Sequence, residues 1–183
     1  MVDDLVNDAK ERMAKSVDAT RTEFNTVRTG RATPALLDRL VVEYYGVPTP
    51  LQQMATVSAP DPRSLLIQPY DVNSLGDIEK AINESDLGIN PSNDGKVVRL
   101  AIPQLTEERR KELVKVVRGL AEEGRVAIRN IRRDVISDLH ELESEVGADE
   151  IHRAEERVQK VTDEHVGQID ALLKQREADI MEV

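Results

Sequence analysis

The sequence predicts an α+β protein of two parts, an elongated up-down-up bundle of three helices with a small α+β domain inserted between the first helix and the second. Apolar residues recur at three- and four-residue steps in three long segments, one at the start of the chain and two in its second half. Seven of the eight prolines lie between positions 34 and 91, and the eighth is Pro103. This change of composition separates the two parts. We therefore expect residues 1–30 and 105–183 to form the bundle and residues 31–104 to form the inserted domain.

The first expected helix spans residues 2–29, which contain no glycine or proline. We expect this helix to end at Gly30, because glycine readily leaves a helix through positive φ, and Pro34 follows soon after. One face of the helix is apolar or small, and its positions are Val6, Ala9, Met13, Val17, Thr20, Phe24 and Val27.

The inserted domain contains short β-rich segments separated by turn-forming residues. Between the third and fourth of these segments, Asn73 or Ser74 is expected to cap a short helix that buries Leu75, Ile78 and Ile82. The segment 90–95 is rich in turn residues and predicts a hairpin. A domain of about 74 residues is large enough to fold, with a thin core. The expected strands are 40–45, 55–58, 64–68, 87–89 and 97–102.

The second and third bundle helices follow Pro103. The second is expected from an N-cap at Thr106 to Leu142, and a break at 144–147 separates it from a third helix capped by Asp149. Narrow apolar stripes do not stabilise single helices in water, so the three helices are expected to bury these stripes against one another. The second stripe comprises Leu113, Val117, Leu120, Ala127, Ile131, Val135 and Leu142. The third comprises Ile151, Ala154, Val158, Val161, His165, Ile169 and Leu172.

The second helix also carries a basic stripe. The stretch 107–133 holds nine Lys or Arg and five Glu, a net charge of +4 within a chain of net charge −10, so the rest of the chain carries −14. Helical spacing places six of these cations on one face, and Arg133 adjoins them. Such a concentration favours contact with a polyanion. The alternative is an ordinary solvated face of mixed charge, since Glu122 lies inside the stripe. The six cations are Lys111, Lys115, Arg118, Arg125, Arg129 and Arg132.

The scarcity of aromatic residues limits how a nucleic acid could bind to this stripe. The four aromatic residues are Phe24, Tyr44, Tyr45 and Tyr70, and none lies among the basic residues of 106–142. Base-stacking platforms for single strands need such rings beside the basic groove. A nucleic acid would therefore be bound through its phosphates and its folded shape. The acidic remainder of the chain should repel nucleic acid elsewhere and confine docking to this helix.

Several other classes of function lack support in the sequence. No apolar run approaches the roughly 20 residues of a membrane span, and the start of the chain lacks a signal-peptide pattern, so we expect a cytoplasmic protein without a membrane partner. The absence of cysteine excludes disulfides and thiolate chemistry. The segment 88–96 resembles a phosphate-binding loop only superficially, and no histidine has metal-site spacing. We therefore expect no enzyme activity, no catalytic or metal site, no cofactor and no small-molecule substrate.

Five motifs resemble those of the bacterial ribosome-recycling factor family, in order and over the whole chain. They are VRTGRA at 27–32, YYG at 44–46, SDLGINPSNDG at 85–95, IPQLTEERR at 102–110 and RNIRR at 129–133. The resemblance implies a three-helix bundle with an inserted β/α/β domain, an L-shaped two-domain molecule similar to transfer RNA. It also implies a translation factor that binds the post-termination ribosome and, with elongation factor G and GTP, splits it into subunits for a new round of protein synthesis.

The resemblance assigns roles to individual positions. Arg129 and Arg132 match the family arginines that contact ribosomal RNA of the large subunit, and both belong to the basic stripe. The candidate RNA-binding residues are Arg28, Arg31, Arg118, Arg125, Arg129, Arg132 and Arg133. Two chain crossings between the domains predict a hinge, which comprises Gly30, Arg31, Pro103, Gln104 and Thr106. Energy for splitting would come from GTP hydrolysis by elongation factor G.

A protein of another class would also fit the helical pattern. A coiled-coil scaffold could use the basic stripe to bind an acidic protein partner, and competition by ribosomal subunits would distinguish the two functions. A monomer is expected in either case, because three apolar seams within one chain suffice to close a bundle.

Overall fold

The computed structural model describes residues 1–27 and 29–182, and it has the α+β fold that the sequence predicts. The chain forms two compact units. One comprises Met1–Thr29 together with Glu107–Val183, and the other comprises Gly30–Thr106. The chain therefore passes from one unit to the other twice, at 29–30 and at 106–107.

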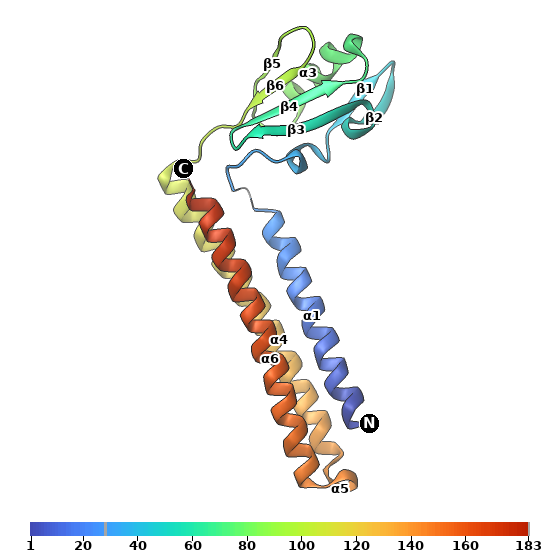
Figure 1. The fold of residues 1–183 in the computed structure, drawn as a ribbon, viewed down its shortest axis with the longest axis vertical. Coiled ribbons are helices and arrows are strands. Elements are labelled where there is room, and N and C mark those ends of the chain that lie inside the picture. Colours follow the sequence, from blue (N-terminus) through green and yellow to red (C-terminus); the bar gives the residue numbers. More distant parts are fainter. Residues whose placement is uncertain (28, 183) are drawn as a thin grey trace. The chain divides into compact units, whose positions relative to one another are not determined.

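The first unit is a bundle of three long helices, α1 (Val2–Asn25), α4 (Glu107–Glu141) and α6 (Ala148–Met181), with the short α5 (Glu143–Val146) joining the last two (Figure 1). Each long helix packs against the other two. Polar contacts define their directions, because Asp3 and Asn25 of α1 contact Arg157 and Arg176 of α6 in the same order. Helices α1 and α6 are thus parallel to each other, and α4 runs antiparallel to α6, in the up-down-up arrangement expected.

Helix α1 buries the predicted face but ends earlier than predicted. Every predicted core position except Val27 is buried, and Val2 is buried as well. The helix ends at Asn25, because the amide and hydroxyl of Thr26 both donate to the carbonyl of Glu23, at 3.1 and 2.7 Å. The Val27 amide likewise donates three residues back, to Phe24. Two consecutive β-branched residues favour this tighter last turn over further α-helix.

Helices α4 and α6 have nearly the predicted bounds but a different buried register. Leu120 and Ala127 of α4 are only half-buried, as are Leu142, which follows α4, and Leu172 of α6. Val161 is half-buried too, and its neighbour Thr162 is buried instead. The prediction took a three-residue step from Val117 to Leu120, whereas the buried face of α4 takes a four-residue step to Ala121. On α6, Val158 is likewise followed by buried Thr162 rather than by Val161. The buried residues of α4 are Leu113, Val117, Ala121, Gly124, Ile128, Ile131, Val135 and Leu139.

The connection between α4 and α6 also differs from the prediction. Most of the expected break forms α5, which ends at Gly147 with a φ of 91°. Gly147, rather than Asp149, occupies the N-cap position of α6, and Asp149 lies in the first turn, where its charge complements the helix dipole. His165 is buried in the bundle, as predicted, and its Nδ1 lies 2.7 Å from the carbonyl of Val161.

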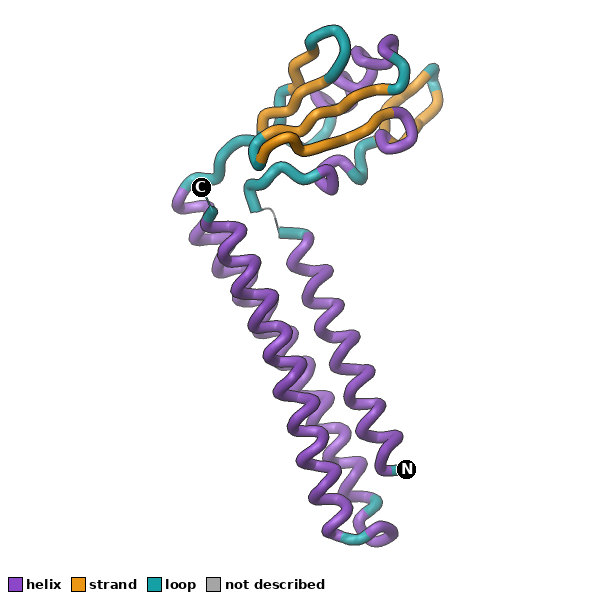
Figure 2. Tube along the Cα trace, in the orientation of Figure 1, coloured by secondary structure: helices purple, strands orange, loops and turns teal. Residues whose placement is uncertain are grey.

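The second unit contains two antiparallel sheets (Figure 2). Strands β1 (Val41–Tyr44) and β2 (Val47–Pro50) form a hairpin, followed by the short helix α2 (Leu51–Met54). The larger sheet has the order β3-β4-β6-β5. Helix α3 (Leu75–Glu84) and the 3₁₀ turns Pro34–Leu37 and Val72–Ser74 complete the unit. The strands of the larger sheet are β3 (Ala55–Asp61), β4 (Ser64–Pro69), β5 (Pro91–Asn93) and β6 (Val98–Ala101).

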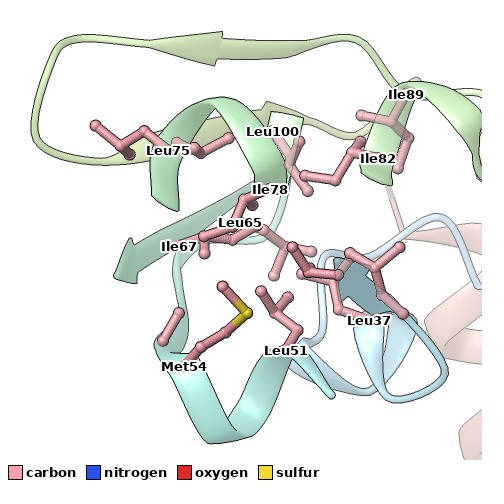
Figure 3. Close-up of a cluster of buried hydrophobic side chains, with 14 of the residues drawn as sticks. Leu37, Leu51, Met54, Leu65, Ile67, Leu75, Ile78, Ile82, Ile89 and Leu100 are labelled. Carbon is pink, nitrogen blue, oxygen red and sulfur yellow. The ribbon is translucent and has the colours of Figure 1, made fainter. Parts of the chain in front are cut away.

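The core of this unit lies between α3, the larger sheet and the segments that precede it (Figure 3). Leu75, Ile78 and Ile82 of α3 are buried, as predicted. They pack with Leu65 and Ile67 of β4 in one apolar cluster. The same cluster includes Leu37, Leu51, Met54, Ile89, Val98 and Leu100.

Three predictions for this unit were wrong in detail. β2 was not expected, because Pro48 and Pro50 argue against a strand, but prolines are tolerated in an edge hairpin. The strand expected at 87–89 forms instead at Pro91–Asn93, inside the predicted turn. Ser74 occupies the N-cap position of α3, as one of the two predicted caps, but its side chain makes no capping bond. Asp71 accepts the Asn73 amide at 2.9 Å and caps the preceding 3₁₀ turn.

A two-residue turn joins β1 to β2. Tyr45 and Gly46 both have positive φ, of 49° and 77°, which is the backbone geometry of a type I′ hairpin turn. This turn leaves the Tyr45 ring 76% exposed and in edge contact with Tyr44, at 4.5 Å between ring centroids.

No helix among residues 1–27 and 29–182 is both long enough and apolar enough to cross a membrane.

Candidate nucleic-acid interface

The basic residues of α4 lie along its seam with α6. Because the two helices are antiparallel, residues that follow one another along α4 meet residues of α6 in reverse order, and four of the polar contacts between described residues lie along this seam. We call these contacts the α4–α6 ladder. Its rungs are Arg118–Glu177 at 2.6 Å, Arg125–Asp170 at 2.7 Å, Arg132–Gln159 at 2.7 Å and His140–Glu155 at 2.7 Å.

Acidic side chains offset much of the charge of the predicted stripe. Glu122 accepts hydrogen bonds from Arg129 at 2.6 Å and from Arg125 at 3.2 Å. These bonds, the one from Arg129 first, lower the pKa of the Glu122 carboxyl below its usual range. Arg118 is paired with Glu177 in the same way. The mixed-charge interpretation that Glu122 suggested therefore describes this part of the stripe correctly.

Arg132 and Arg133 differ from Arg118, Arg125 and Arg129 of the basic stripe. Arg132 donates from Nε to the side-chain oxygen of Gln159, a neutral amide. Arg133 is exposed and makes no hydrogen bond or ion pair with any residue that the structure describes. The positive charge of both guanidinium groups is thus left without a carboxylate partner, which makes this turn of α4 the most favourable place for a phosphate.

A shallow hollow of about 540 Å³ opens beside these two arginines, between α4 and α6. Its α4 wall carries Arg132 and Arg133 and is cationic, whereas its α6 wall carries Glu155 and Glu156. A polyanion would therefore approach along the α4 wall. The lining is completed by Ile136, Ser137, His152 and Gln159.

The remaining cations of the basic stripe and the remaining candidate RNA-binding residues are distributed more widely. Lys111 pairs with Glu107 at 3.3 Å, and Lys115 is exposed on the same helix. Arg31 is exposed but belongs to the second unit, so it does not lie on α4. Arg28 lies outside the described residues.

The five predicted hinge residues all belong to the second unit, and backbone hydrogen bonds hold the residues next to them within it. The Ala32 amide donates to the Pro62 carbonyl at 2.7 Å, and the Ile102 amide donates to the Arg63 carbonyl at 2.8 Å. Both crossing segments are thus tied to one turn, between β3 and β4. The Gln104 amide fits best with its oxygen facing the Arg63 guanidinium, 2.8 Å from Nη1.

Gly30 closes this end of the second unit. Its φ is 76°, and a β-carbon at this position would lie 3.0 Å from the side chain of Leu105. The two ends of the inserted domain are therefore adjacent. Thr106, which was expected to cap α4, directly precedes the first residue of that helix.

Two polar residues that organise this surface could not be identified from the sequence. Gln159 and Asp163 lie one turn apart on α6, and Gln159 Nε2 donates to Asp163 Oδ1 at 2.8 Å. Neither residue belongs to a sequence motif. They matter only because α4 places Arg132 next to Gln159. No group of three or more His, Asp or Glu in the described part of the chain is arranged to hold a metal ion.

Comparisons with known proteins agree on one family. The family model described as "Ribosome recycling factor" matches residues 20–181. The ribosome-recycling factor of Thermosynechococcus vestitus is 57% identical over 178 residues, which cover 96% of this chain and 98% of that protein. The ribosome-recycling factor of Carboxydothermus hydrogenoformans is 54% identical, with full coverage of both chains.

Two solved structures are similar over the whole chain. A solution structure of the ribosome recycling factor has a TM-score of 0.76 at 41% identity and covers 100% of this chain and 98% of that one. A model of the T. thermophilus ribosome recycling factor, described with E. coli elongation factor G bound to the E. coli post-termination complex, has a TM-score of 0.66 at 50% identity, with both chains fully covered.

Proposed function

The chain belongs to the ribosome recycling factor family, and on that premise we propose that it binds the post-termination ribosome and, with elongation factor G and GTP, splits it into subunits for a new round of protein synthesis. The family consists of translation factors that are not enzymes, so the protein itself makes and breaks no covalent bond. Its contribution is binding, and GTP hydrolysis by elongation factor G supplies the energy. The protein acts in the cytoplasm, where ribosomes work.

The basic side of α4 docks on ribosomal RNA of the large subunit. Arg132 and Arg133 make the principal phosphate contacts, because neither guanidinium forms an ion pair with a carboxylate among the described residues. Arg118, Arg125 and Arg129 contribute less, since a phosphate must first compete with the carboxylates that hold them. Arg28 and Arg31 are further candidates through the family motif at 27–32.

The observation that carries this docking is the difference between Arg132 and its neighbours on the ladder. Surface ion pairs are weak individually, yet each one still places a negative charge where a phosphate would have to bind. Among the four contacts of the α4–α6 ladder, the one at Arg132 has an uncharged partner on α6, and Arg133 lies next to it. An acidic protein partner of a scaffold would meet the same surface, but the family favours the ribosome.

The two chain crossings act as a hinge between the bundle and the inserted domain. Gly30, Arg31, Pro103, Gln104 and Thr106 surround these crossings. Because residues 32 and 102 are anchored on one turn of the inserted domain, motion would be concentrated between that anchor and the bundle helices. A hinge here would let elongation factor G displace the inserted domain while the bundle stays docked.

Binding to purified large ribosomal subunits across a salt series tests the docking. Arg132→Ala and Arg133→Ala should each weaken binding about tenfold, as expected for a lost charge-assisted hydrogen bond. Each should also reduce the slope of log affinity against log salt by about one. Arg118→Ala is the matched control on the same helix face and should weaken binding by less than about twofold.

Circular dichroism should show unchanged helix content in all three variants, because these side chains lie on the surface. Equal losses for Arg118→Ala and Arg132→Ala would contradict the special role of the Arg132 turn. A parent protein that does not bind large subunits would contradict the proposed function itself.

A further inference from the structure

The third rung of the α4–α6 ladder is built differently from the others. In the other three rungs the α6 side chain is a carboxylate, supplied by Glu177, Asp170 and Glu155. In the rung at Arg132 it is the amide of Gln159, with the same 2.7 Å separation from the α4 side chain. An amide accepts a hydrogen bond as a carboxylate does, but it brings no negative charge.

A second hydrogen bond fixes the orientation of this amide. Gln159 Nε2 donates to Asp163 Oδ1 at 2.8 Å, one turn further along α6. Because the amide nitrogen is held by Asp163, the amide oxygen points the other way, toward α4 and Arg132. The result is a chain of two hydrogen bonds from Arg132 through Gln159 to Asp163.

These two hydrogen bonds leave the phosphate-binding edge of the Arg132 guanidinium open. Gln159 takes only Nε, and the two terminal nitrogens of the guanidinium have no partner among the residues that the structure describes. These two groups form the fork that binds two oxygens of a phosphate at once. The side chain is therefore oriented and half-buried without losing its charge or its phosphate-binding edge.

We propose that Gln159 is a positioning residue for RNA binding, which holds the Arg132 guanidinium ready for a phosphodiester and leaves its charge uncompensated. This inference rests on the proposed function, since it names how one arginine of that interface is prepared for its ligand. Its energetic basis is preorganisation, because a long side chain that is already fixed loses less conformational freedom on binding.

A double-mutant cycle with Gln159→Ala and Arg132→Ala tests the inference, with large ribosomal subunits as the ligand. Gln159→Ala should weaken binding by about three- to tenfold in the parent, the range expected for immobilising one flexible side chain. In the Arg132→Ala background the same change should have less than about a twofold effect, because the group that it positions is already gone.

Gln159→Glu separates positioning from charge. This variant keeps the hydrogen-bond acceptor but adds the carboxylate found in the other rungs. It should weaken binding more than Gln159→Ala does and reduce the slope of log affinity against log salt by about one, as though the Arg132 contact were neutralised.

Gln168 provides a matched control on the same helix. It is exposed and lies nine residues further along α6, which places it about 180° around the helix from Gln159. Gln168→Ala and Gln168→Glu make the same chemical changes on the opposite side of α6 and should leave binding within about twofold of the parent.

The outcomes distinguish this inference from the proposed function. Equal effects of Gln159→Ala in both backgrounds would overturn the positioning role while leaving RNA docking intact. Equal losses from Gln159→Glu and Gln168→Glu would also overturn it, by showing a general charge effect. If the parent itself did not bind large subunits, both the proposed function and this inference would fall.

Discussion

Gly124 of α4 faces Thr20 of α1 with no room for a side chain between the two helices. A β-carbon at position 124 would lie 2.9 Å from Ile169 Cδ1 on α6 and closer still to Thr20 Oγ1. Thr20 is buried, and its hydroxyl donates to the Ser16 carbonyl at 3.0 Å, so it cannot turn away without losing that bond. All three bundle helices therefore meet at this glycine.

Gly124→Ala should destabilise the bundle. Alanine gains up to about 1 kcal/mol in helix propensity over glycine, but overpacking a tight interface costs about 1 to 3 kcal/mol, so the steric term should dominate. Thermal unfolding followed by circular dichroism measures the change. Gly119→Ala is the control, because nothing lies within 4 Å of its added β-carbon, and it should stabilise the same helix. A melting temperature raised equally by both substitutions would contradict the close approach at Gly124.

The pair of Tyr44 and Asp71 should produce one unusually basic tyrosine. Tyr44 Oη donates to Asp71 Oδ2 at 2.8 Å, and this bond is the largest of the effects that raise the pKa of Tyr44 to about 12. Spectrophotometric titration should therefore show one of the three tyrosines ionising last, and Tyr44→Phe should remove that step. Asp71→Asn should bring the step down toward the ordinary value of 10.0. A late step that survives in Tyr44→Phe would assign it to another tyrosine.

The same pair predicts the direction of two stability changes with pH. The folded-state pKa of Tyr44 is raised, so its contribution to the free energy of unfolding is complete below pH 10.0 and is lost as pH rises toward about 12. The folded-state pKa of Asp71 is lowered, first of all by the bond from Tyr44, so its contribution is present above the unfolded value of 3.8 and is lost as pH falls below it. Hydrogen exchange of the β1–β2 amides across pH would follow both losses, and Tyr44→Phe should abolish the alkaline one.

Glu122→Gln should strengthen binding to RNA. Glu122 holds Arg129 at 2.6 Å and also accepts from Arg125, so its removal frees one arginine fully and another in part. The salt dependence of binding to large ribosomal subunits should become steeper by up to about one unit of log–log slope. Glu123→Gln is the control, because it removes the same charge from the neighbouring position, whose side chain forms no hydrogen bond or ion pair with these arginines or any other described residue. Weaker binding in Glu122→Gln would mean that this carboxylate orients Arg129 for its ligand.

Gly30→Ala should loosen the junction of the inserted domain. Its φ of 76° costs a non-glycine residue about 1 to 2 kcal/mol, and the new methyl group would also press on Leu105. Gly88→Ala carries only the first cost, because its φ is 64° and nothing lies within 4 Å. Hydrogen exchange at the Ala32 and Ile102 amides should therefore accelerate more in Gly30→Ala than in Gly88→Ala. Equal rates in the two variants would show that the Leu105 contact contributes nothing.

The long helices and their approximate faces could be predicted from the sequence, because each face repeats over many turns. The core positions of α1 from Val6 to Phe24 were all predicted correctly. The register of α4 and α6 was harder to predict, because positions three and four residues apart both lie on the same face of a helix, as with Val161 and Thr162 after Val158. Short elements such as β2 and β5 were missed because their stability depends on tertiary pairing rather than on local preference.

The candidate site could be predicted only in part. The basic stripe is visible in the sequence, since it depends on spacing within one helix. The partner of each arginine depends on a second helix distant in sequence, so the sequence could not distinguish Arg118, paired with Glu177, from Arg132, paired with Gln159. Glu122 could be identified from the sequence as an acidic residue within the stripe. Its bond to Arg129, seven residues away, could be found only from the side-chain conformations in the structure.

The anchoring of both crossing segments on the Pro62–Arg63 turn bears on how an insertion of this size can interrupt a helical bundle. The entropic cost of an inserted segment depends on the distance between its ends, and here Gly30 packs against Leu105, so the ends already meet within the inserted domain. To the bundle, residues 30–106 are therefore equivalent to a short loop. The same geometry makes these residues a self-closed module, suited to expression on its own or to circular permutation with its natural ends joined.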